Sequence, residues 1–269
     1  MRKITRITTQ KKSKDRYNIF LSKGGDEVYG FSVNEAILIE YRLRKNLELD
    51  DAMIETLVQK DTLHKSYTQT INFLSYRMRT KKEIHDYLVK KEANPEHISP
   101  IIKRLTDEKL LDDKQFADMF VRTRMNTSSK GPMIIKKELM EKGVAAMIAS
   151  EAVEKYPYEV QFENVSKWIE KKLNQSKKES HRKQIQQLQS TLMQKGFTQD
   201  VIKDALAEME DRKDDNEEWH ALVYQGEKLI RKHGTKMEGY QLKNKVKEGL
   251  YRKGFSIDLI SRFLETYME

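Results

Sequence analysis

Four segments of the chain share one spacing of apolar residues, which is typical of a repeated helical module. In each segment a leucine recurs, at intervals of 51, 53 and 58 residues, and the last three leucines lie three residues before a Lys-Gly pair. A further amphipathic stretch precedes each leucine segment, so that each unit contains three helices. Internal repetition at this period indicates a solenoid-like array of stacked modules. The landmark leucines are Leu88, Leu139, Leu192 and Leu250.

The shared glycines have a conformational reason. Gly143, Gly196 and Gly254 each follow a lysine at the end of a predicted helix. A residue just past a helix end often adopts the left-handed conformation, which glycine adopts without strain. The preceding lysine complements the negative end of the helix dipole. The first unit departs from this pattern, because Glu92 stands where the others have glycine.

The first sixty residues differ in composition from the rest of the chain and predict a small β/α element. The predicted strands cover residues 4–10, 17–22 and 27–33, which are rich in β-branched and aromatic residues. Two glycines between the last two strands favour a hairpin turn. A helix is expected over 34–43 with Asn34 as its N-cap, and another over 49–59, capped by Asp50 or Asp51.

The fold class predicted from these patterns is mainly α: an elongated array of tandem three-helix repeats with a small N-terminal β/α element. In the first repeat, the first helix is expected to cover 70–77. Charged residues make up 35% of the chain, which suits helices with long solvated faces. The predicted domains are 1–60 for the N-terminal element and 61–109, 110–160, 161–212 and 213–269 for repeats 1 to 4.

Two adjacent acids in the stretch Leu110–Val121 raise the question of a metal site. Asp112 stands three residues before Gln115, which is the spacing of a helix capping box. If the helix starts one residue later, Asp113 is the cap. No histidine or third acid lies at a ligand-like spacing. We therefore interpret the pair as the start of a helix.

The chain lacks the patterns that catalysis and cofactor binding require. It has no cysteine, its six histidines are scattered without metal-ligand spacing, and it has neither a phosphate-binding glycine loop nor a Gly-x-Ser-x-Gly elbow. We expect no enzyme activity, no catalytic residue, no metal and no cofactor. No stretch resembles a signal peptide or a membrane span. The expected location is the cytoplasm, with no membrane partner.

Basic residues gather at the corner between the first and second helices of each unit. The formal net charge is +9, which favours a polyanion or an acidic protein as partner. Units three and four carry basic stretches at 171–183 and 228–237. A stripe of such corners can track a nucleic-acid backbone or a charged filament, although helix ends are also ordinary places for lysine. No aromatic residues are interleaved as a base-stacking platform, so reading of a single-stranded sequence is not expected. The binding candidates are Arg77, Arg79, Lys81, Lys82, Arg122, Arg124, Lys130, Lys136 and Lys137.

The same residues carry a resemblance to the RecX family of bacterial recombination regulators. The similar features lie in LSYRMRTKKEIHDYL, in RLTDEKLLDDKQFADMFVRTR and in KGPMIIKKELMEKGV, and similarity extends through most of the chain. The resemblance implies a monomeric, non-enzymatic negative regulator of RecA in recombinational DNA repair and the SOS response. Such a protein binds the RecA–single-stranded DNA filament along its helical groove, contacts the DNA weakly or indirectly, and inhibits ATP hydrolysis, filament extension and strand exchange.

Two other classes of function stay open at this point. A sequence-independent DNA-binding helical protein, or a transcription regulator of the helix-turn-helix type, is also built from short helices. A helical scaffold for some other acidic protein fits the charge equally well.

Overall fold

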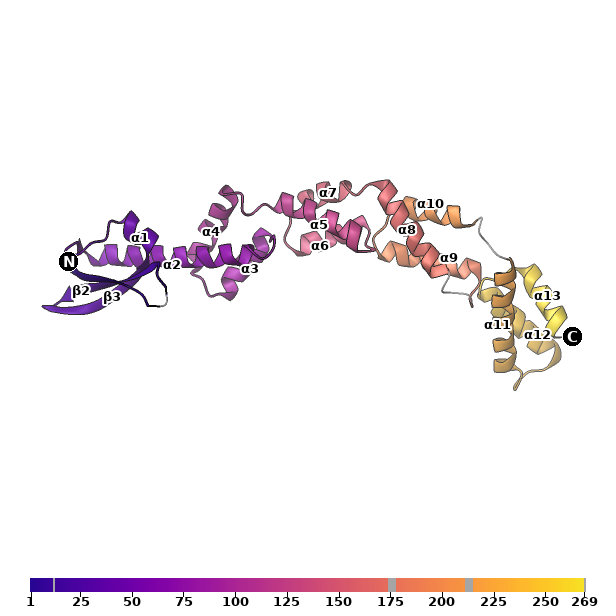
Figure 1. Ribbon diagram of the computed structural model, residues 1–269. Coiled ribbons are helices and arrows are strands. Elements are labelled where there is room, and N and C mark those ends of the chain that lie inside the picture. Colours follow the sequence, from indigo (N-terminus) through magenta and orange to yellow (C-terminus); the bar gives the residue numbers. More distant parts are fainter. Residues whose placement is uncertain (12, 174–177, 211–214, 269) are drawn as a thin grey trace. The chain divides into compact units, whose positions relative to one another are not determined.

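The computed structural model describes residues 1–11, 13–173, 178–210 and 215–268, and in these it forms thirteen helices and four short strands. The mainly helical fold with an N-terminal strand element is as predicted (Figure 1). By its internal contacts the chain divides into two units, Met1–Phe116 and Ala117–Glu269. Each unit is described by itself below.

The N-terminal element is a four-stranded antiparallel sheet in the order β3-β2-β1-β4. Its three longer strands confirm the predicted ones, whereas the short β4, which pairs with the start of β1, was not expected. Glycines at φ +61° and +97° make the turn between β2 and β3. Ile4, Ile19 and Val33 are fully buried in the core of this element. The strands are β1 (Arg2–Thr9), β2 (Arg16–Lys23), β3 (Asp26–Asn34) and β4 (Glu48–Leu49).

Both predicted N-caps of the first helices are confirmed. The side chain of Asn34 accepts a hydrogen bond from the Ala36 amide at 2.9 Å and starts α1 (Glu35–Glu40). The side chain of Asp50 accepts one from the Met53 amide at 2.7 Å and starts the next helix, α2.

The prediction of two separate helices, over 49–59 and 70–77, is wrong. A single helix, α2 (Asp51–Leu74), runs through both segments. Residues 60–69 contain neither glycine nor proline, so nothing in them ends a helix. Midway along it, Asp61 pairs with Arg16 at 2.6 Å and accepts a hydrogen bond from the Asn34 amide at 2.7 Å. This buried carboxylate fastens the helix to the sheet.

Further along the chain the helices succeed one another in threes. Repeat 1 consists of the second half of α2, α3 and α4; repeat 2 of α5–α7; repeat 3 of α8–α10; and repeat 4 of α11–α13 (Figure 1). The landmark leucines are buried in the second helix of each repeat. The bounds are α3 (Lys81–Lys90), α4 (Pro95–Asp107), α5 (Asp113–Thr127), α6 (Pro132–Glu141), α7 (Ala146–Glu154), α8 (Tyr158–Leu173), α9 (His181–Gln194), α10 (Gln199–Glu210), α11 (Asp215–His233), α12 (Gly239–Arg252) and α13 (Ile257–Tyr267).

The division into five domains stays a prediction. The boundary expected at residues 60 and 61 falls inside the continuous helix α2. The boundary expected at residues 212 and 213 lies outside the described residues.

The glycines of the Lys-Gly corners adopt the predicted left-handed backbone conformation. Their φ angles are +86° at Gly143, +87° at Gly196 and +90° at Gly254. Glu92, at the equivalent place in repeat 1, also has a positive φ, of +54°. The corner thus has a positive φ in all four repeats, and in repeat 1 it carries the strain of a non-glycine residue.

Two of these corners also join neighbouring repeats. The Gly131 amide, at the start of α6 in repeat 2, donates to the Lys195 carbonyl at 2.7 Å, and the Met133 amide donates to the Gly196 carbonyl at 3.1 Å. A Cβ on Gly196 would lie 2.6 Å from the Ile134 amide nitrogen. Close backbone approach, in addition to the left-handed φ, therefore requires glycine here.

The next pair of repeats is joined in a similar way. Ser180, the N-cap of α9, donates its hydroxyl to the carbonyl of Lys253 in repeat 4. The Gly254 Cα lies so close that an added Cβ would be 2.9 Å from the Ser180 hydroxyl. In both cases the corner of one repeat satisfies polar groups at the N-terminus of the second helix of the repeat before it.

Three alanine substitutions separate backbone conformation from close contact. Gly239→Ala tests conformation alone, because its φ is +53° and no atom lies within 4 Å of an added Cβ. Gly131→Ala tests contact alone, because its φ is −81° and its Cβ would collide with the Gly196 carbonyl group. Gly196→Ala tests both together, because its φ is +87° and its Cβ would lie 2.6 Å from the Ile134 amide nitrogen. We expect Gly239→Ala to lower the free energy of unfolding by about 1 kcal/mol, and Gly131→Ala and Gly196→Ala to lower it by roughly 2–4 kcal/mol.

Urea unfolding followed by tryptophan fluorescence measures these losses. Wild-type stability of Gly131→Ala, or equal losses for Gly196→Ala and Gly239→Ala, would contradict the contact between repeats 2 and 3.

Candidate functional site

The two adjacent acids cap two different helices. The Asp112 side chain accepts hydrogen bonds from the Lys114 and Gln115 amides, at 2.8 and 3.1 Å, and so caps α5 as predicted. The Asp113 side chain reaches instead to the Lys81 amide, at 2.9 Å, in the first turn of α3. The pair therefore holds the start of α3 in repeat 1 and the start of α5 in repeat 2. Sequence reasoning missed the second contact because it depends on tertiary packing.

Among the described residues, no group of three or more His, Asp or Glu side chains is placed to hold a metal ion. In the same residues, no helix is long and apolar enough to cross a membrane.

Of the basic candidates in repeat 1, two are held by the protein itself. Arg77 pairs with Glu83 at 3.1 Å. The Arg79 guanidinium lies 3.7 Å from the centroid of the Phe73 ring, and its Nε is buried without a hydrogen-bond partner in the described part of the chain. Burial, followed by the nearby charge of Arg77, lowers the pKa of Arg79. Lys81 and Lys82 are exposed.

The candidates of repeat 2 surround a partly buried carboxylate. Glu138 on α6 pairs with Arg124 at 2.9 Å and also with Lys130. Burial alone would raise the pKa of Glu138, but the hydrogen bond from Lys130 and the two positive charges outweigh it and lower the pKa. Arg124 and Lys130 are therefore partners within the repeat as well as candidates for binding.

The other three candidates in this repeat point to solvent more freely. Arg122 is exposed and Lys136 is half-buried, and neither forms an ion pair with any residue that the structure describes. Lys137 lies 4.0 Å from Glu141 in an exposed pair, which contributes little to stability.

Aromatic side chains lie beside the basic groups at one repeated position, and the expected absence of a base-stacking platform stays a prediction. Phe73, Phe120 and Trp168 recur at intervals of 47 and 48 residues on the first helices of repeats 1 to 3. Arg124 lies 4.8 Å from the Phe120 centroid, and Lys195 lies 5.4 Å from the Trp168 ring. With Arg79 on Phe73, each ring therefore has a cation beside it. The fixed interval between these aromatic residues is visible in the sequence alone and could have identified the position.

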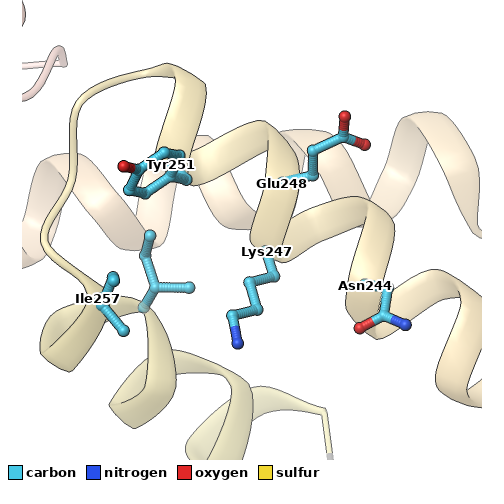
Figure 2. Close-up of a pocket in the computed structure, with 6 residues that line it drawn as sticks. Asn244, Lys247, Glu248, Tyr251 and Ile257 are labelled. Carbon is cyan, nitrogen blue, oxygen red and sulfur yellow. The ribbon is translucent and has the colours of Figure 1, made fainter.

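Repeat 4 differs at this position. Its equivalent residue is Gln225, whose side chain donates to the Lys178 carbonyl at 2.6 Å. Repeat 4 also has a separate hollow of about 270 Å³, which Gln225 does not line. Lys247, Glu248 and Tyr251 on α12 and Ile257 at the start of α13 surround it (Figure 2). Glu248 pairs there with Lys245 at 3.2 Å and also with Arg252.

The basic stretch of repeat 3 is only partly described, whereas that of repeat 4 is described throughout. Residues 174–177 of the stretch 171–183 lie outside the described residues. In the stretch 228–237, Arg231 forms an exposed pair with Glu227 at 3.8 Å.

Comparison with protein-family models accounts for almost every helix of the chain. The model described as "Regulatory protein RecX N-terminal domain" matches residues 2–50, and those for the first and second RecX three-helix domains match 67–105 and 112–153. The model for the third three-helix domain matches twice, at 159–206 and 216–264. The chain belongs to the RecX family. Its fourth repeat is a second copy of the third domain type.

Similarity to individual relatives extends from end to end. The chain is 57% identical over 270 residues to "Regulatory protein RecX" of Oceanobacillus iheyensis, covering 100% of this chain and 99% of that protein. It is 43% identical to the protein of the same name from Bacillus cytotoxicus, covering 99% and 98%.

Solved structures agree with the fold. A crystal structure of regulatory protein RecX is 37% identical with a TM-score of 0.67, and covers 76% of this chain and 100% of its own. RecX from Lactobacillus salivarius is also 37% identical, with a TM-score of 0.54, and covers 56% and 98%.

Removing the charge of Glu138 tests whether it holds the cations of repeat 2. Its folded-state pKa lies below the ordinary value of 4.5. The carboxylate therefore stabilises the fold above that value, and the stabilisation is lost as the pH falls through the folded-state pKa. We expect Glu138→Gln to lower the free energy of unfolding by about 1 kcal/mol at neutral pH, with the difference vanishing in acid.

Urea unfolding at neutral pH and at a pH below the folded-state pKa of Glu138 measures this change. The control is Glu163→Gln, which removes one exposed pair with Lys167 and should change little. A difference that is the same at both pH values would contradict the assignment.

Proposed function

We propose that this RecX-family chain is a non-enzymatic negative regulator of the RecA recombinase. It binds the RecA–single-stranded DNA filament along its helical groove and inhibits ATP hydrolysis, filament extension and strand exchange. Its setting is recombinational DNA repair and the SOS response in the cytoplasm, where it acts as a monomer without a membrane or a cofactor.

The observation that carries this proposal is the end-to-end similarity to proteins named regulatory, 57% identical over 100% of this chain. A regulator that acts by binding needs an extended contact surface. The chain supplies four successive three-helix repeats, and in the first three a cation lies beside the ring of Phe73, Phe120 or Trp168. Several weak contacts on one chain act together through effective concentration.

The net charge of +9 supports an acidic partner. Lys81, Arg122 and Lys136 are the most available of the candidates, because they form no ion pair with any described residue. Arg124 and Lys130 instead share Glu138, so reversing their charge would disturb these ion pairs within the repeat together with any external contact. The first three residues therefore test binding most directly.

Reversal of these three charges should weaken inhibition without unfolding the chain. For the combined variant Lys81→Glu, Arg122→Glu and Lys136→Glu, we expect half-inhibition of RecA ATP hydrolysis at a concentration roughly tenfold or more above that of the wild type. The assay is ATP hydrolysis by RecA on single-stranded DNA, with circular dichroism to monitor folding.

A matched control reverses three exposed lysines outside the candidate set, with Lys65→Glu, Lys103→Glu and Lys203→Glu. It changes the net charge equally and should inhibit more strongly than the first variant. Equal inhibition by the two variants would mean that net charge, and not these three positions, determines inhibition. Wild-type inhibition by the Lys81, Arg122 and Lys136 variant would remove these residues from the mechanism.

A further inference from the structure

We propose that a hollow beside Trp168 in repeat 3 is a stacking site for one base of single-stranded nucleic acid. The hollow has a volume of about 370 Å³ and lies between α8 and α9. Trp168 forms one wall, while Gln184 and Gln187 lie on α9 and Lys172 at the end of α8. One part of the indole packs on the core of the repeat, and the ring is half-buried.

The residue before each landmark leucine decides whether the aromatic ring of the repeat is covered. In repeat 1 this residue is Tyr87, which stacks on Phe73 with centroids 4.0 Å apart and an interplanar angle of 7°. The stack and the guanidinium of Arg79 leave no room for another flat group on Phe73.

In repeat 2 the corresponding residue is Glu138, which holds Arg124 beside the Phe120 ring. In repeat 3 it is Thr191, which is too small to cover an indole. Within the described residues, no aromatic ring stacks on Trp168. The largest of the three rings therefore faces the hollow.

The charges around this hollow suit a polyanion. No carboxylate is among the described residues that line it. Three other hollows each include a carboxylate: that of Phe73 has Glu83 and Asp86, another has Asp107, and that in Figure 2 has Glu248. The ammonium groups of Lys172 and Lys195 lie 6.0 and 5.4 Å from the Trp168 ring.

These features match what single-stranded nucleic acid offers. A base stacks on an aromatic ring whatever its sequence, and lysines beside the ring attract the phosphates that flank the base. The Gln187 amide can both donate to and accept from a base edge, whereas the Gln184 amide already donates to the Glu179 carbonyl at 2.6 Å and offers its oxygen as an acceptor. A carboxylate at the wall would repel the phosphates, which is why the hollow beside Phe73 is the poorer candidate.

The site deepens the proposed function and rests on it in one respect: single-stranded DNA is the polyanion present in the filament. Its test needs no RecA. The chain has two tryptophans, so the variant Trp219→Phe leaves Trp168 as the single fluorophore. We expect oligothymidylate to quench its emission, and a sugar–phosphate backbone of the same length without bases to leave it unchanged. The converse variant Trp168→Phe, which reports on Trp219, should show no quenching by either.

A second variant covers the Trp168 ring as Tyr87 covers Phe73 in repeat 1. Thr191→Tyr places a ring where Tyr87 lies in repeat 1, and should weaken oligothymidylate binding roughly tenfold. Ser190→Tyr adds the same side chain at the neighbouring exposed position of α9, away from the hollow, and should bind as the wild type does.

Three results would overturn the site: no quenching of Trp168, equal quenching by the base-free backbone, or unchanged oligothymidylate binding by Thr191→Tyr. If Thr191→Tyr lost only its inhibition of RecA, the hollow would instead belong to a protein side chain. If any of these results were found while the wild-type chain still inhibited RecA, the Trp168 site would be overturned and the proposed function would stand.

Discussion

The left-handed corner that ends the second helix of each repeat is the constraint on which the helical part of the chain depends. At Gly196 and Gly254 it reverses the chain and also brings backbone close enough to join one repeat to the next. The Lys195 and Gly196 carbonyls accept from amides at the start of α6, which would otherwise lack partners. Between repeats 2 and 3 both partners are backbone groups, so side chains around that corner can vary without loss of these hydrogen bonds, whereas the joint between repeats 3 and 4 requires the Ser180 hydroxyl.

Much of this arrangement follows from local sequence. The glycines, the caps Asn34, Asp50 and Asp112, and the three longer strands are predictable because each depends on residues a few positions apart. The continuity of α2 was missed because similar stretches in the other repeats start separate helices. The reach of Asp113 to the Lys81 amide was missed because it joins residues far apart in the chain.

The candidate site shows the same limit more clearly. Charge and position along the chain mark the basic residues, but they do not reveal that Arg124 and Lys130 share Glu138 or that Arg79 lies on Phe73. Pairing inside a repeat and binding outside it compete for the same cations. The repeats therefore differ in what they offer a partner: a covered ring in repeat 1, a carboxylate-held cluster in repeat 2, and an open indole in repeat 3.

The most direct test of the account is RecA's ATP hydrolysis on single-stranded DNA as this chain is added, beside its binding to bare DNA at the same salt. The account predicts half-inhibition at a concentration well below the one that saturates bare DNA, because the filament is the target. Inhibition that only follows the coating of DNA, or no inhibition at any concentration, would contradict it.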